Sequence, residues 1–372
     1  MPLAQWVQAG NDIDGYGSSL DLSSNGIVLA LGSRYSNAGG LHAGQVAVFV
    51  NTEGAWMQRG NVLIGASTRA EFGYSVALSA DGGILAVGSN NFVEATGSSL
   101  GKVSVLKWHE NDWRALGPPI DGEVNSGFGA AVALSDDGTV LAVGALFQEQ
   151  SGQVTVFTWE GTSWNQRGDS LIPNNPMPND LFGIAVAVSF DGSVVACGAA
   201  QSIAGNPGLV QVYRWNGTRY IQQGSTLFGF RSNANFGISV SLSGDGSILA
   251  VGASDSSSVT VFQYVTQHAE WFQIGQTLFG VPRELFGWSV RLSLAGDTLV
   301  VGRPWNDANG SNSGRASVFR LSSDTNQWLP VGQGLYGAAG DEFGLSVSIS
   351  RDGTRIAVGA TEAGYARVLD LQ

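Results

Sequence analysis

Large and small side chains alternate in a short run that recurs along the whole chain. One copy reads FGYSVALS from Phe72, and the others keep the order aromatic residue, glycine, variable residue, serine or alanine. Alternation with a period of two is typical of a β-strand with one buried face. The copies begin at Tyr16, Phe72, Phe128, Phe182, Phe236, Phe286 and Phe343. They lie 56, 56, 54, 54, 50 and 57 residues apart, and this near-constant interval predicts a repeat fold.

Three further strand patterns follow in each repeat. A turn with Asp-Gly or Asn-Gly, such as SADGG from Ser79, leads into an apolar run such as ILAVG from Ile84. Both dipeptides tolerate the positive φ of tight hairpins. After a Gly-, Ser- and Asn-rich loop comes a third run, such as VSVLKW from Val103. The fourth run is an aromatic residue with a glycine four positions later, as in WMQRG from Trp56.

The aromatic–glycine run does not occur in the same repeats as the other three strand patterns. It first occurs at Trp6–Gly10, before the first repeat, and it is missing after the last repeat, which begins at Phe343. The N-terminal segment can therefore supply the fourth strand of the last repeat and close a ring without a free edge. We predict an all-β fold, a seven-bladed β-propeller of four-stranded blades. A β-solenoid is the alternative, but it would not explain the displaced strand.

The repeat also predicts the blade boundaries within a single domain over residues 1–372. The expected segments are 16–71, 72–127, 128–181, 182–235, 236–285 and 286–342 for blades 1 to 6, and 343–372 with 1–15 for blade 7. The tryptophan that opens most fourth strands recurs as core spacing demands, so we expect it to pack between adjacent blades. Cys197 lies in the apolar run SVVACGAA, and we expect it to be buried.

The repeat resembles a known family. The stretches FGYSVALSADGGILAVGS and GKVSVLKW, followed by W-x-x-x-G, are similar to the FG-GAP repeat. In FGWSVRLSLAGDTLVVGRPW, Gly302-Arg303-Pro304 stands where that family has Gly-Ala-Pro. The resemblance implies the propeller found in integrin α-subunits and in many microbial and algal surface proteins. It also implies a role in binding or adhesion at an extracellular or cell-surface location.

Calcium sites are not carried over from the resemblance. Integrin-type repeats place D-x-D-x-D-G loops between the first two strands, and calcium needs six to eight oxygen ligands. This chain has one acidic residue there, as in Asp81-Gly82 and Asp245-Gly246, or two in Asp136-Asp137. We therefore interpret these segments as turns and expect no metal site and no cofactor.

Charge and hydropathy exclude several classes of partner. The net charge is −12, from 18 basic and 30 acidic residues. An acidic chain does not provide the Lys and Arg that displace counterions from a nucleic acid. The sequence has no apolar run of about 18 residues, so we predict no membrane insertion. It also shows no signal-peptide pattern at residues 1–15, although a cleaved leader would leave none.

The long, irregular loops join the second and third strands, and in a propeller they share one face with the loops between blades. Variable loops on a regular scaffold are where binding sites are usually built. We expect this face to bind a protein or a glycan, because exposed aromatic side chains can stack on sugars or anchor a partner. The candidate ligand-binding residues and their polar partners are Arg34, Tyr35, Phe92, Phe147, Glu149, Trp288, Arg303 and Trp305.

Acidic residues precede most of the aromatic–glycine pairs, and ring closure would place them near the channel mouth. They are Asp14, Glu71, Glu123, Asp180, Glu284, Asp341 and Glu342. They could form a cation site or bond to the backbone of their own loops. Asn216-Gly-Thr and Asn309-Gly-Ser are candidate glycosylation sites.

Three functions fit this sequence. The first is a binding or adhesion module, which the resemblance favours. The second is an architectural subunit of a larger assembly, and the chain would be either a monomeric domain or part of such an assembly. The third is an enzyme that acts on polysaccharides, with acid and base groups such as Asp180, Glu284 and Asp341 gathered in the central funnel.

Overall fold

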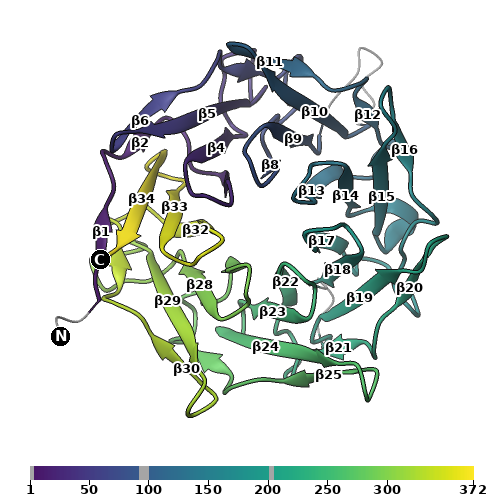
Figure 1. Cartoon of the computed structure of the whole chain (residues 1–372), viewed down its shortest axis with the longest axis vertical. Helices are drawn as coiled ribbons and strands as arrows, with labels where there is room; N and C mark the ends of the chain where they lie inside the picture. The colour runs from purple at the N-terminus through teal and green to yellow at the C-terminus, as the bar shows by residue number, and fades with distance from the viewer. Residues whose placement is uncertain (1–3, 92–99, 201–204) are drawn as a thin grey trace.

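The computed structural model describes residues 4–91, 100–200 and 205–372. Within these ranges the strands form seven antiparallel sheets that stand around a central axis (Figure 1). The first and last strands, β1 (Trp6–Gln8) and β34 (Tyr365–Leu371), lie side by side in the ring. The prediction of a seven-bladed β-propeller is confirmed. No helix in the described ranges has the length and hydropathy needed to span a membrane.

The first three blades follow the chain from Ser19 to Gln166. Blade 1 holds β3 (Ser19–Leu22), β4 (Val28–Ser33), β5 (Gln45–Thr52), β6 (Ala55–Gln58) and β7 (Leu63–Ile64). Blade 2 holds β8 (Ser75–Leu78), β9 (Ile84–Ser89), β10 (Lys102–His109), β11 (Asp112–Ala115) and β12 (Ile120–Asp121). Blade 3 holds β13 (Phe128–Leu134), β14 (Val140–Ala145), the 3₁₀ helix η1 (Gln148–Gln150), β15 (Gln153–Trp159) and β16 (Trp164–Gln166).

The next two blades continue the same order of strands. Blade 4 holds β17 (Phe182–Val188), β18 (Val194–Ala199), β19 (Leu209–Trp215), β20 (Tyr220–Gln222) and β21 (Leu227–Phe228). Blade 5 holds β22 (Phe236–Leu242), β23 (Ile248–Ala253), β24 (Ser258–Val265), β25 (Glu270–Gln273) and β26 (Leu278–Phe279).

The last two blades complete the ring. Blade 6 holds β27 (Val290–Leu292), β28 (Thr298–Arg303), β29 (Arg315–Ser322), β30 (Gln327–Pro330) and β31 (Leu335–Tyr336). Blade 7 holds β32 (Phe343–Ile349), β33 (Arg355–Ala360) and β34 (Tyr365–Leu371), together with the N-terminal β1 (Trp6–Gln8) and β2 (Ile13–Asp14).

The N-terminal segment closes the ring as predicted. β1 pairs with β34 in antiparallel register, with Trp6 opposite Leu371. The Trp6 side chain is buried, and its indole N–H donates to the carbonyl oxygen of Val331 in blade 6 at 3.0 Å. The first strand of the chain therefore joins the last blade to its neighbour.

The outer edge of the blades has one feature that the sequence patterns did not predict. In blade 1, β6 pairs with the second half of β5, and the short β7 pairs with Gln45 and Val46 at its start. The fourth strand is therefore interrupted, and its second piece leads into the loop toward the next blade. In five other blades of the described part of the chain, a short strand pairs with the third strand in the same way. These short strands are β2, β12, β21, β26 and β31.

The glycines of the repeat allow adjacent blades to approach closely. A Cβ atom on Gly302 of blade 6 would lie 1.9 Å from the carbonyl oxygen of Gly344 in blade 7. The Ser289 hydroxyl donates to that same carbonyl oxygen at 2.8 Å. The aromatic–Gly-x-Ser run and the glycine that ends the second strand therefore meet at the contact between blades.

The repeated tryptophan also acts between blades. The Trp113 indole N–H donates to the carbonyl oxygen of Arg59 in the preceding blade at 3.0 Å, and Trp328 donates to Ile274 at 3.2 Å. Both rings are buried. The prediction that this tryptophan packs between blades is confirmed. Cys197 is fully buried as well, and burial raises the pKa of its thiol.

The Ser-x-Asp-Gly turn is held by its own hydrogen bonds. In blade 5, the Asp245 carboxylate accepts bonds from the Ser243 hydroxyl at 2.7 Å and from the Ser247 N–H at 2.9 Å. Burial would raise the pKa of Asp245, but these hydrogen bonds outweigh it, so the pKa lies below its usual value. The aspartate therefore serves the turn, as the sequence interpretation requires.

Candidate functional site

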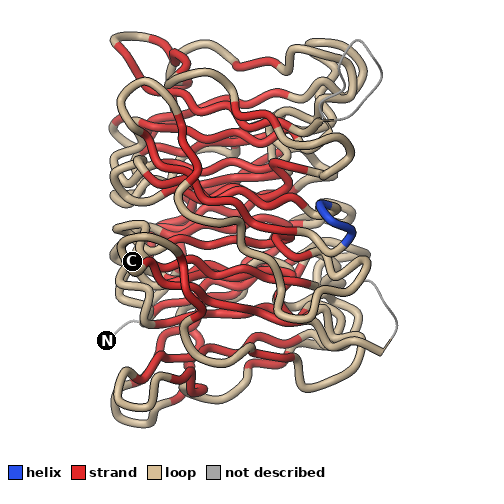
Figure 2. The backbone as a smooth tube through the Cα atoms, turned by 90° about the vertical axis from the view of Figure 1, so that its right-hand side faces the viewer, coloured by secondary structure: helices blue, strands red, loops and turns tan. Residues whose placement is uncertain are grey.

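The two ends of the ring differ in the length of their connections. Figure 2 shows the blades from the side, with η1 among the long connections at the right and the short turns at the left. The long connections join the second strand to the third and one blade to the next. We call their side the loop face and the other side the turn face.

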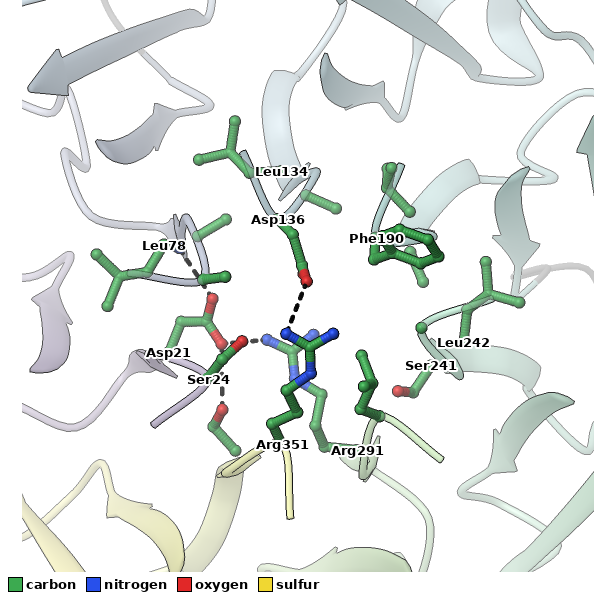
Figure 3. A pocket seen from close by; sticks show the side chains of 18 of the residues that line it. Asp21, Ser24, Leu78, Leu134, Asp136, Phe190, Ser241, Leu242, Arg291 and Arg351 are labelled. Carbon is green, nitrogen blue, oxygen red and sulfur yellow. Dashed lines mark hydrogen bonds and ion pairs between the residues drawn. The ribbon is translucent and has the colours of Figure 1, made fainter. Parts of the chain in front are cut away.

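The central channel narrows at the turn face, where charged side chains cross it. Asp21 of blade 1 pairs with Arg291 of blade 6, and Arg351 of blade 7 reaches Asp136 of blade 3 at 3.7 Å (Figure 3). The remaining cavity is 140 Å³, which is below the roughly 300 Å³ of ordinary small-molecule sites. These ion pairs link blade 1 to blade 6 and blade 3 to blade 7 across the channel.

A larger cavity lies on the loop face between blades 2 and 3. Its volume is 350 Å³, and it is built by four connections: before β8, after β9, before β13 and after β14. Glu71 and Asn125 both have left-handed backbone conformations, with φ of 53° and 59°. We call this cavity the loop-face pocket. Its lining residues are Glu71, Asn90, Asn91, Asn125, Gly127 and Phe147.

The polar groups of the loop-face pocket are incompletely satisfied. Among the described residues, the Oδ1 atom of Asn90 is buried and has no hydrogen-bond partner. A buried polar atom without a partner carries a desolvation cost. Burial raises the pKa of Glu71, although Arg34 and His42 act in the opposite direction. The Phe147 ring is 54% exposed and offers an apolar surface beside these groups.

Arg34 and Tyr35 adjoin the pocket through Glu71. The Arg34 guanidinium lies 4.6 Å from the ring centre of Tyr35 and 4.8 Å from that of Tyr74. Tyr35 is half exposed and also contacts His42, with ring centres 5.3 Å apart. These contacts fix the guanidinium between two aromatic rings, at a distance where it still lowers the pKa of Glu71.

The other predicted ligand residues lie in blade 6, on another side of the ring. Arg303 is buried, pairs with Glu284 at 2.9 Å and lies over the Phe286 ring at 4.9 Å. Trp305 is 45% exposed and lies near Glu342, where it opposes the rise that burial causes in the pKa of that carboxyl group. Trp288 is half-buried. The structure therefore separates these three residues from Arg34, Tyr35 and Phe147, and Phe92 lies outside the described residues.

The acidic residues expected at the channel mouth are dispersed. Asp14 lies in β2 beside the third strand of blade 7, on the outer part of the sheet and not at the channel. Asp180 is buried and accepts a bond from the Met177 N–H at 2.8 Å. Asp341 accepts the Tyr365 hydroxyl at 2.8 Å. Within the described ranges, no three His, Cys, Asp or Glu side chains are placed to hold a metal ion.

The two glycosylation candidates occupy different settings. Asn216 lies in an exposed turn, where its side-chain oxygen accepts the Thr218 N–H at 3.0 Å. Asn309 is exposed in a long loop of blade 6, and its side-chain NH₂ donates to the carbonyl oxygen of Gly337 at 2.7 Å.

The amides of the loop-face pocket were not among the predicted residues. The sequence signal was the pair Asn90-Asn91 directly after the second strand of blade 2, where the other repeats have different residues. Tyr74 was also missed, although it occupies the variable position of the aromatic–Gly-x-Ser run. These residues come from loops that share no pattern with one another, so only the folded ring shows that they meet.

Comparison with known proteins supports the fold more than any function. Residues 280–319 match the FG-GAP repeat, and this stretch contains the close approach at Gly302. A similar solved structure is the β-propeller domain of Cps50 (Swd1) from Myceliophteria thermophila, with 13% identity and a TM-score of 0.68. The match covers 99% of this chain and 100% of that one. No curated protein matches the sequence of this chain.

Proposed function

Because the chain carries an FG-GAP repeat within a seven-bladed propeller, we propose that it is a binding module whose loop-face pocket receives a glycan. The observation that carries the proposal is the lining of this pocket, where the Glu71 carboxyl group, the amides of Asn90, Asn91 and Asn125 and the exposed Phe147 ring surround one cavity.

The chemistry of the lining favours a ligand rich in hydroxyl groups. Each asparagine amide offers two N–H donors and one carbonyl acceptor, and a carboxylate accepts on both oxygens. Sugar hydroxyls donate and accept, so they can match Glu71, Asn90, Asn91 and Asn125 together. The exposed Phe147 ring gives the C–H face of a sugar an apolar surface on which to stack. The volume of 350 Å³ falls within the range of small-molecule sites.

The direct test is a thermal-shift screen of the protein against a panel of oligosaccharides that includes neutral, uronic-acid, sialylated and sulfated members. A ligand at about 100 times its Kd stabilises the native state by about 2.7 kcal/mol. We expect at least one class to raise the melting temperature, and the Kd of that class to weaken about tenfold or more in Phe147→Ala and Asn90→Ala.

Trp305→Ala is the matched control for this screen. It removes another half-exposed aromatic side chain from the same face, but from blade 6 rather than from the pocket. We expect its Kd to equal that of the wild type. A panel without any stabilising glycan, or a glycan that Trp305→Ala weakens and Phe147→Ala does not, would refute the proposal.

A further inference from the structure

A second surface, at the rim of blades 4 and 5, exposes several large apolar side chains. Phe228 and Phe279 are 58% and 69% exposed, and Phe230 and Val281, two residues further along their loops, are 72% and 55% exposed. Phe230 and Phe279 line a single groove of 540 Å³. We call it the aromatic groove. Contiguous exposed apolar side chains of this kind mark interaction sites in soluble proteins.

The repeat shows that the fold does not require phenylalanine at these positions. Phe228 and Phe279 are the last residues of β21 and β26, and the same position is Asp121 in β12 and Asp14 in β2. Phe230 follows Phe228 by two residues, and the residue at the equivalent position after Asp121 is Glu123. Blades with acidic residues at these places form the same sheet, so the phenylalanines of blades 4 and 5 are not needed for folding.

The floor of the aromatic groove is polar, but its groups already bond to one another. The hydroxyls of Thr260 and Thr277 lie 3.3 Å apart, and Gln273 donates to Thr277 at 3.2 Å. The hydroxyls of Ser256 and Ser258 lie 2.7 Å apart. What the groove offers to a ligand is therefore the two phenyl rings. This favours an apolar side chain as the occupant over a sugar, which would need free polar partners.

The charged side chain in the lining of the groove, Arg231, has the opposite sign to the net charge of the chain. Arg231 lines the groove, and the lining contains no Asp or Glu. Arg283, in the loop that follows Phe279, is exposed. In the described part of the chain neither guanidinium forms an ion pair. On a molecule with a net charge of −12, two unpaired arginines beside an apolar groove complement an acidic partner.

We propose that the aromatic groove docks a segment of another protein in which a large apolar side chain is flanked by Asp or Glu. The apolar side chain inserts between Phe230 and Phe279, and the carboxylate pairs with Arg231. Aromatic and arginine side chains are the residue types that carry most binding energy at protein interfaces. The site is separate from the loop-face pocket, which lies between blades 2 and 3. A negative result for the glycan proposal would therefore leave this proposal unchanged, and the reverse also holds.

The probe for this inference is a phage-displayed library of random 12-residue peptides, selected on the whole chain. Enriched peptides are then synthesised, and their Kd is measured by fluorescence anisotropy. We expect the enriched sequences to pair Phe, Trp or Leu with Asp or Glu. The Kd should weaken at least tenfold in Phe279→Ala and in Phe230→Ala, and Arg231→Glu should weaken it further than Arg231→Gln.

Two control variants separate the groove from apolar surface in general. Phe190→Ala removes a phenylalanine that is 45% exposed on the turn face, and Ile64→Ala removes the equivalent side chain from blade 1. Both should bind the peptides as the wild type does. All variants should keep the wild-type melting temperature, because the side chains that they remove are largely exposed.

Three outcomes would overturn the inference. One is a selection that enriches no sequence with an apolar and an acidic residue together. Another is a Kd that changes less than threefold in Phe230→Ala and Phe279→Ala. The third is an oligosaccharide that binds the wild type and loses its binding in Phe279→Ala, which would make the groove a sugar site.

Discussion

The main-chain N–H of Arg351, in blade 7, donates to the carbonyl oxygen of Ser24, in blade 1, at 2.8 Å. The equivalent bond runs from Ser24 to Ala80 at 2.9 Å and from Ala80 to Asp136 at 2.8 Å, and it continues from blade to blade around the channel. This circle of backbone hydrogen bonds on the turn face closes the ring a second time, independently of β1. It also positions Asp136 and Arg351 to meet across the channel.

Removing the Trp6 side chain should destabilise the whole ring. The side chain is 3% exposed and packs in the core between blades 6 and 7, and truncating a buried tryptophan to alanine costs about 3 to 5 kcal/mol. Urea unfolding of Trp6→Ala should still be one cooperative transition, but at a lower midpoint. Trp305→Ala, at a half-exposed position, should shift the midpoint little. Equal midpoints in the two variants would show that β1 does not hold the ring.

The approach of Gly302 to Gly344 leaves no space for a methyl group. In Gly302→Ala the new Cβ would have to push blades 6 and 7 apart, so we expect a loss of about 1 to 3 kcal/mol of stability. Gly83→Ala is the control, because its Cβ would meet only the Asp81 side chain, at 3.0 Å. Chemical denaturation of both variants measures the difference, and a Gly302→Ala protein as stable as Gly83→Ala would contradict the packing described for the repeat.

The ion pair between Asp21 and Arg291 should couple blades 1 and 6. Asp21 also accepts the Leu78 N–H at 2.9 Å and the Ser348 hydroxyl at 3.1 Å. Asp21→Ala leaves these donors and the guanidinium without their acceptor, so it should cost about 3 kcal/mol. The double variant with Arg291→Met should lose less than the sum of the two single variants. Additive losses in a double-mutant cycle would show that the pair is not coupled.

Stability should fall in acid because of the turn aspartates. Hydrogen bonds outweigh burial and hold the pKa below its usual value for Asp81, Asp137, Asp191, Asp245 and Asp352. Their contribution is therefore fully present above the unfolded-state pKa, roughly 4, and it is lost as pH falls through the lower folded-state values. Urea unfolding at pH 6 and at pH 3 should show this loss.

Asp245→Asn provides the control for the acid effect. Blade 1 has asparagine in the same turn, where Asn25 accepts the Ser23 hydroxyl at 2.8 Å, so the substitution keeps the turn but removes its titration. The variant should lose less stability between pH 6 and pH 3 than the wild type does. If the variant and the wild type lose the same stability between pH 6 and pH 3, the acid effect comes from other carboxylates.

The repeat pattern predicted most of the architecture, because strands, turns and blade contacts follow from residues that recur. The displaced run at Trp6–Gly10 was sufficient to place β1 in the last blade. The short outer segments such as β7 were not predicted, since two residues carry no periodicity. Their signal was a glycine nine residues after the aromatic residue, as between Trp56 and Gly65.

The candidate sites were only partly predictable, because they depend on residues that do not recur. Asp21 and Arg291 occupy the same strand position in blades 1 and 6, where other blades have small residues, and nothing local indicates that they meet. The sequence named Phe147 as a residue of the loop face, but it placed Glu71 in an acidic ring at the channel mouth rather than in a pocket with Phe147. The partnerless Oδ1 atom of Asn90 did not, because burial is a property of the folded loops.

The most direct test of the proposed function is hydrogen–deuterium exchange of the whole chain with and without a saturating concentration of the glycan found in the screen. We predict slower exchange in the peptides that contain Asn90, Asn125 and Phe147, and unchanged exchange in those that contain Phe230 and Phe279. Protection confined to the turn face, or to blades 4 and 5, would contradict the assignment of the loop-face pocket as the glycan site.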